Sequence, residues 1–152
     1  MSPLTPLETR ALRMLARREH SRRELEQKLS VHAESCETGV LASVLDKLEQ
    51  KGFLSEQRAV EQIARTRRAR FGSHRIVHEL KAKGIDSHLI DNILPTLKQT
   101  ELEAALNIWR KKFDHPSVSK EERGKQVWFM MNRGFSMETI QQVLAQADEE
   151  ST

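Results

Sequence analysis

His74 and His78 lie four residues apart, a spacing that places two imidazoles on one face of a helix. Two histidines are half of a tetrahedral zinc site, but no carboxylate lies between them and Arg75 would repel a cation. Cys36 stands between Glu34 and Glu37, whose negative charges disfavour a reactive thiolate. We therefore predict polar surface histidines and an inert cysteine, with no metal site.

No other pattern supports catalysis. The sequence has no glycine-rich phosphate loop, no dinucleotide-binding fingerprint, no serine elbow and no HExxH motif. Acidic pairs such as Glu121 and Glu122 stand where helix N-termini favour negative charge, which explains them without acid–base chemistry. We predict no catalytic residues and no cofactor, and we interpret the protein as one that binds a partner.

Positive charge is concentrated in two segments. Residues 65–83 hold seven Lys or Arg and one acid, and residues 10–28 hold seven against three acids. Such density is typical of a surface for nucleic acid or another polyanion, although a solvated helix face has the same pattern. Arginine can contact a phosphate with two parallel hydrogen bonds. The candidate partner- and DNA-binding residues are Arg65, Arg67, Arg68, Arg70, Arg75, Lys81, Lys83, Arg17, Arg18, Arg22 and Arg23.

Helix starts are marked by side chains that can cap an N-terminus. A Ser or Thr followed three residues later by Glu, the capping-box pattern, occurs at Thr5, Ser21, Thr100 and Ser119. Single caps are predicted at Ser55, Ser73, Asp86 or Ser87, and Ser136. Helix ends are predicted at three glycines, each followed by an apolar residue: Gly52, Gly84 and Gly134. These marks predict nine helices, at about 5–18, 21–31, 38–51, 55–71, 73–83, 87–98, 100–113, 119–133 and 136–147.

An apolar triplet recurs with a period close to 50 residues. Leu45, Leu94 and Leu144 each end such a triplet, and each lies on the third helix of a group of three. Recurrence of this kind indicates stacked, similar units. The predicted fold is all-α, with three tandem three-helix repeats, resembling helix–turn–helix units, in an elongated, curved array. The repeats are placed at 1–53, 54–98 and 99–152, and polar connections are expected at 30–38 and 114–119.

The composition indicates the cellular compartment in which the protein is expected. A single cysteine allows no intramolecular disulfide, and no apolar stretch reaches the ~18 residues of a membrane span, so a soluble, cytoplasmic protein is expected. Aromatic residues are few and gather near the C-terminus. Trp109 and Phe113 continue an apolar helical stripe and are expected in the core, although base stacking by Trp109 or Trp128 is an alternative.

The central segment carries a resemblance to a known family. Phe71–Ile85, with a glycine before Arg-Ile, then Glu-Leu and Lys-Gly-Ile, resembles the central signature of the RecX family. Residues 21–29, 48–58 and 132–144 are similar to the family's opening, middle and closing motifs in the same order. The chain departs from the family pattern after the second helix, where Ser30-Val31-His32 replaces a Lys-Gly-Phe-like stop, and at Ala59-Val60.

The resemblance implies a non-catalytic regulator of homologous recombination. Members of this family have three tandem three-helix repeats, bind the RecA filament on single-stranded DNA, and inhibit its ATP hydrolysis and strand exchange. Single-stranded DNA, and double-stranded DNA as a further possibility, are implied partners, and a monomer is expected. The alternatives are a stand-alone helix–turn–helix DNA-binding module, with tight and sequence-specific duplex binding, and a structural scaffold.

Overall fold

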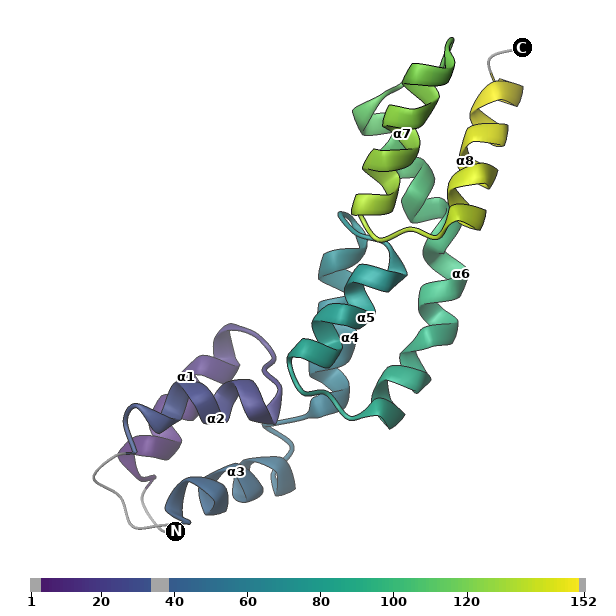
Figure 1. Cartoon of the computed structure of the whole chain (residues 1–152). Helices are drawn as coiled ribbons and strands as arrows, with labels where there is room; N and C mark the ends of the chain where they lie inside the picture. The colour runs from purple at the N-terminus through teal and green to yellow at the C-terminus, as the bar shows by residue number, and fades with distance from the viewer. Residues whose placement is uncertain (1–3, 34–38, 151–152) are drawn as a thin grey trace.

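The computed structural model describes residues 4–33 and 39–150. Over these ranges the chain is all-α and elongated, with the two ends of the chain at opposite ends of the array (Figure 1). No helix in the described ranges has the length and apolar character that crossing a bilayer requires. The helices are α1 (Pro6–Arg17), α2 (Arg22–Ser30), α3 (Val40–Gln50), α4 (Glu56–Arg68), α5 (Ser73–Ala82), α6 (Ser87–Lys112), α7 (Lys120–Asn132) and α8 (Met137–Glu150).

Most predicted helix starts are confirmed by hydrogen bonds. A side-chain oxygen accepts from a backbone N–H two or three residues later at Thr5, Ser21, Ser55, Asp86, Ser119 and Ser136. A cap of this type contributes about 1 kcal/mol to stability. Ser73 is different, because α5 begins at Ser73 itself and Gly72 occupies the cap position without a side-chain bond. The Ser73 hydroxyl instead donates to the carboxylate of Glu101.

The predicted glycine stops are also confirmed. Gly52, Gly84 and Gly134 have φ values of 80°, 76° and 94°, in the left-handed region that favours glycine. After Gly84, the N–H of Ile85 donates to the carbonyl of Leu80 at 3.1 Å, which closes the last turn of α5. Ile85 is buried there, so the chain turns into the next helix with its apolar side chain inside.

The predicted break between 98 and 100 is wrong. One helix, α6, runs for 26 residues through Pro95 and Thr100. The Thr100 hydroxyl does not cap a new helix but bonds back to the carbonyl of Thr96 at 2.9 Å. Burial on both sides keeps the helix continuous, because Leu97 packs in one core and Ala105 in the next. The described residues therefore form eight helices, and the prediction of nine is corrected.

Three separate apolar cores account for the three repeats. One is enclosed by α1–α3, the second by α4–α6 and the third by α6–α8. The last leucine of the recurring triplet lies in the core in two of the three repeats. Leu45 and Leu144 are buried, but Leu94 is 40% exposed. Ile90, in the same triplet, is buried instead. Helix α6 turns Leu94 outward because it must also present Leu97 to the second core and its C-terminal half to the third.

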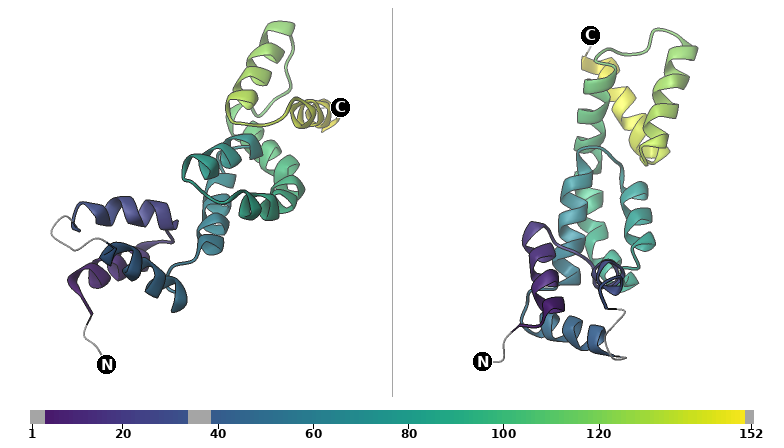
Figure 2. Two further views of the ribbon diagram at one scale, coloured as in Figure 1. Left: turned by 60° about the horizontal axis from the view of Figure 1, so that its bottom comes forward. Right: turned by 90° about the vertical axis from the view of Figure 1, so that its left-hand side faces the viewer.

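The two junctions between repeats differ in kind. The second and third repeats share α6, and a short backbone contact joins them: the Gly72 N–H donates to the Arg133 carbonyl at 2.7 Å. The first repeat contacts the second through polar groups, including an ion pair of 2.9 Å between Arg58 and Glu19. The backbone N–H of Arg22 also donates to the carboxylate of Glu56. In the left view of Figure 2 the α1–α3 repeat accordingly stands to one side of the rest.

Candidate cationic interface

Two of the predicted arginines are engaged inside the second repeat. The Arg67 guanidinium donates to the Glu79 carboxylate at 3.1 Å, with both side chains partly exposed. Arg68 forms an ion pair of 2.7 Å with Glu101, and these side chains are only 13% and 12% exposed. Arg68 is therefore a structural residue that fastens α4 to α6.

The Arg68 guanidinium is almost saturated with acceptors. Besides Glu101, its partners are the Thr100 hydroxyl at 3.0 Å and the Ser73 hydroxyl at 3.1 Å. The Phe71 carbonyl accepts at 3.3 Å, and the Leu97 carbonyl accepts as well. A guanidinium has five N–H donors, so few remain for an outside ligand.

The first-repeat arginines also have partners within the chain. Arg18 and Glu24 form an ion pair of 2.6 Å, and this hydrogen bond is the main cause that lowers the pKa of Glu24. Arg22 contacts Glu49 at 2.8 Å and Asp46 at 2.7 Å, and its bond to Glu49 is the main cause of its raised pKa.

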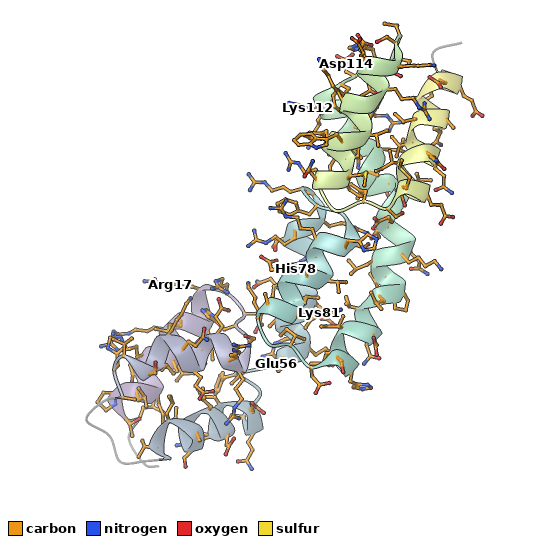
Figure 3. The ribbon with its side chains drawn as sticks, in the orientation of Figure 1. Arg17, Glu56, His78, Lys81, Lys112 and Asp114 are labelled. Carbon is orange, nitrogen blue, oxygen red and sulfur yellow. The ribbon has the colours of Figure 1, made fainter. Side chains whose placement is uncertain are left out.

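Arg23 is exposed, and it also approaches the second repeat. Its side chain lies so close to Gly84 that a β-carbon there would be 2.6 Å from Arg23 Cδ. Arg17 is exposed at the end of α1. In Figure 3, Arg17 and Lys112 lie on the same side of the array, the side toward which it bends.

His20 gives this end of the chain a pH dependence. It is 3% exposed; its Nδ1 donates to the Arg18 carbonyl at 3.0 Å, and its Nε2 accepts from Lys28 at 3.2 Å. Burial lowers the pKa of His20, so the folded protein holds a neutral ring where the unfolded chain, near pH 6.5, begins to bind a proton.

Stability should therefore fall as the pH drops below about 6.5, by at most about 1.4 kcal/mol per pH unit for this one proton. Urea unfolding at pH 7.5 and pH 5.5 measures the effect, and the variant His20→Gln should show a smaller difference between the two. Glu24 adds a loss in the same direction only at lower pH, below about 4.5, because its pKa is also lowered in the folded state. An equal pH dependence in His20→Gln and the wild type would contradict this assignment.

Arg75 belongs to a stack of alternating cations and aromatic rings that crosses the junction of the second and third repeats. Its guanidinium carbon lies 4.3 Å from the centre of the Phe71 ring. Arg133 lies between two rings, 5.8 Å from Phe71 and 5.0 Å from Phe129. The Lys112 ammonium completes the series at 5.3 Å from Phe129. We call Lys112, Phe129, Arg133, Phe71 and Arg75 the cation–π stack.

Backbone contacts hold the cation–π stack in place. Besides the Gly72 bond, the N–H of His74 donates to the Gly134 carbonyl at 3.1 Å. Two stack arginines reach across in opposite directions: Arg75 donates to the Asn132 carbonyl at 3.1 Å and Arg133 to the Arg70 carbonyl at 3.3 Å. The loop before α5 and the end of α7 are thereby fixed against each other.

The cation–π stack presents charge that is not neutralised locally. Among the described residues, no carboxylate forms an ion pair with Arg75, Arg133 or Lys112. A contact with a ring uses none of the five N–H donors of a guanidinium, and Arg75 and Arg133 each give one to a carbonyl, so others remain for acceptors. Of the remaining predicted cations, Arg65 and Arg70 are exposed in the last turn of α4 and just after it, while Lys81, which is exposed, and Lys83, which is half-buried, lie at the end of α5 opposite to Arg75. Figure 3 shows Lys81 on α5.

Sequence reasoning missed most of this surface. It named Arg75 and Arg70, but it gave no role to Lys112, Arg133 or Phe129. These residues lie about 40–60 positions from Phe71 along the chain and meet it only through the folded junction. The one available cue was Phe71 itself, which directly follows the densest arginine run. The predicted pair His74 and His78 gains no third ligand, because no group of three metal-ligating side chains occurs among the described residues. Cys36 lies outside the described residues.

Comparisons with known proteins agree with this architecture. Residues 55–94 match the family model described as the second three-helix domain of RecX, and residues 99–144 match the model of its third. The "Regulatory protein RecX" of Leptothrix cholodnii is 43% identical over 148 residues, which cover 97% of this chain and 93% of that protein. Its counterpart in Neisseria meningitidis is 37% identical over 99% of this chain and 97% of that protein.

Solved structures give the same fold. The crystal structure of RecX from Lactobacillus salivarius matches with a TM-score of 0.76, over 94% of this chain and 95% of that chain, at 19% sequence identity. A second RecX crystal structure matches with a TM-score of 0.69, over 90% of this chain and 70% of that chain. The all-α array of three-helix repeats is thus shared with proteins of low sequence identity.

Proposed function

Because the chain belongs to the RecX family of regulatory proteins, we propose that it regulates homologous recombination by binding the RecA filament on single-stranded DNA. In this proposal it is not an enzyme, it acts in the cytoplasm as a monomer, and it inhibits the ATPase and strand-exchange activities of the filament. The observation that carries the proposal is the family match over almost the whole chain. In the same proposal, the three repeats of the protein, over residues 1–53, 54–98 and 99–152, contact successive protomers of the filament.

The cation–π stack is the part of the surface that we assign to DNA phosphates. Arg75, Arg133 and Lys112 are fixed by rings and carbonyls, so less side-chain freedom is lost when a phosphate binds. Each guanidinium edge can donate two parallel hydrogen bonds to a phosphate. Arg68 is left out of this role because its donors are already used.

The test is the DNA-dependent ATPase of RecA, titrated with this protein. We expect inhibition at micromolar concentrations or below. Unchanged ATP hydrolysis would overturn the proposal, and tight, sequence-specific binding to duplex DNA in the same protein would favour a stand-alone helix–turn–helix module instead.

Neutralising the stack should change how DNA affinity depends on salt. The variants Arg75→Gln and Arg133→Gln should each reduce the slope of log K against log salt by about 0.7 for single-stranded DNA, because each phosphate contact releases counterions. Fluorescence anisotropy at several salt concentrations measures the slope. Arg110→Gln removes the same charge from an exposed pair with Glu150, 2.8 Å away, and should leave the slope unchanged. If the wild type and the three variants had equal salt slopes, the cation–π stack would be assigned to protein contacts instead.

A further inference from the structure

An apolar stripe runs along the outer face of α7. Gly124, Trp128 and Met131 stand at positions i, i+4 and i+7, which lie on one side of a helix over a length of about 10 Å. Trp128 is 68% exposed and Met131 54% exposed, whereas the other tryptophan, Trp109, is 4% exposed. Exposed tryptophan is rare on a surface without a partner, and tryptophan is enriched at the centres of protein interfaces.

Gly124 makes no close packing contact in the part of the chain that the structure describes. It lies in the middle of α7, and beyond its own helix backbone no described atom lies within 4 Å of the position that a β-carbon would take. A glycine in a helix interior is less stable than alanine, and packing here gives no reason for it. Gly124 leaves the surface of α7 without a side chain one turn from Trp128, so the backbone of another molecule can approach closely there.

The charges beside the stripe are mainly positive. Lys120, Arg123 and Lys125 are exposed on α7. Of the two acids in the first turn, Glu121 is exposed, while the carboxylate of Glu122 accepts a bond from the Val118 N–H at 2.9 Å. A partner that covers the stripe therefore needs negative charge at its edges.

We propose that this face of α7 docks an amphipathic helix of the partner protein, with its apolar side on the stripe and acidic residues facing the α7 cations. The length of the stripe fits a helix crossing, and the glycine lets the two helix backbones approach. Stacking of a single base on Trp128 would use the indole but would leave the glycine unexplained. This inference rests on the proposed function: RecA supplies the helix, while the cation–π stack contacts DNA.

The variant Gly124→Ala separates docking from folding, because the two effects have opposite signs. Alanine is the better helix former, and its methyl group meets no atom of another described segment, so the Tm should rise by about 2–4 °C. The added methyl group should nevertheless weaken binding to RecA filaments, assembled on oligo-dT with a non-hydrolysable ATP analogue, by tenfold or more. Trp128→Ala should weaken binding at least as much, with little change in Tm.

Met137→Ala is the matched control, since Met137 is 47% exposed but lies on α8 rather than on the stripe of α7. It should bind filaments like the wild type. Wild-type affinity in both α7 variants would overturn this inference and leave the proposed function intact, whereas a wild-type protein without effect on RecA would overturn the proposed function itself. Two other results would overturn the docking inference. One is quenching of the Trp128 fluorescence by oligo-dT alone, which indicates base stacking. The other is a dimer in sedimentation that Trp128→Ala dissociates.

Discussion

Replacing Arg68 by alanine is expected to lower the free energy of unfolding by about 3–5 kcal/mol. The substitution leaves the Glu101 carboxylate, which is 12% exposed, without its counter-charge, and it leaves the Leu97 and Phe71 carbonyls without a donor. Urea unfolding followed by circular dichroism gives the value. Although Arg68 was selected from the sequence as a DNA-binding candidate, its largest effect should therefore be on stability.

The control for this prediction is Arg65→Ala, one turn earlier on α4. Arg65 is exposed, so the same substitution should change the free energy of unfolding by less than about 0.5 kcal/mol. A double replacement of Arg68 and Glu101 by apolar residues of similar volume should recover much of the loss, because no unpaired charge remains. If Arg68→Ala proved as mild as Arg65→Ala, the ion pair would not fasten α4 to α6.

Gly72→Ala is expected to destabilise the junction of the second and third repeats by about 1–3 kcal/mol, through overpacking. A β-carbon on Gly72 would lie 2.4 Å from the carbonyl carbon and oxygen of Gly134, so the backbone must move. That movement weakens the Gly72–Arg133 hydrogen bond and shifts Phe71 relative to Arg133. Thermal unfolding should show a lower Tm, and single-stranded DNA affinity should fall with it.

The same substitution at Gly124, which meets open space, should raise the Tm. The contrast excludes a general effect of alanine on these helices. An unchanged Tm in Gly72→Ala would mean that the two repeats are held by α6 alone.

Local signals predicted much of the fold because they act within a few residues. Caps such as Ser21 and stops such as Gly134 depend on one side chain or one backbone angle, and the structure confirms them. The helix start predicted at Thr100 was wrong, because a capping pattern is local and carries no information about burial on both sides, which makes a continuous helix more stable. The recurring triplet was a poor guide at Leu94, which is exposed, for the same reason: one helix, α6, packs in two cores.

The candidate site was less accessible to sequence reasoning. Charge density identified Arg75, but it could not separate Arg75 from Arg68, whose side chain points into the repeat. The other half of the cation–π stack depends on the pairing of residues 72–74 with 133–134, which no local pattern encodes. Long-range contacts of this kind require the folded chain.

The sharing of α6 has a consequence for the way the molecule comes apart. The second and third cores both rest on this helix, so a local opening that melts its middle removes support from both at once. The first core has helices of its own and is attached by polar contacts. Three structural repeats thus make two cooperative units, and amide hydrogen exchange in α4–α8 should follow one opening free energy while α1–α3 follows another.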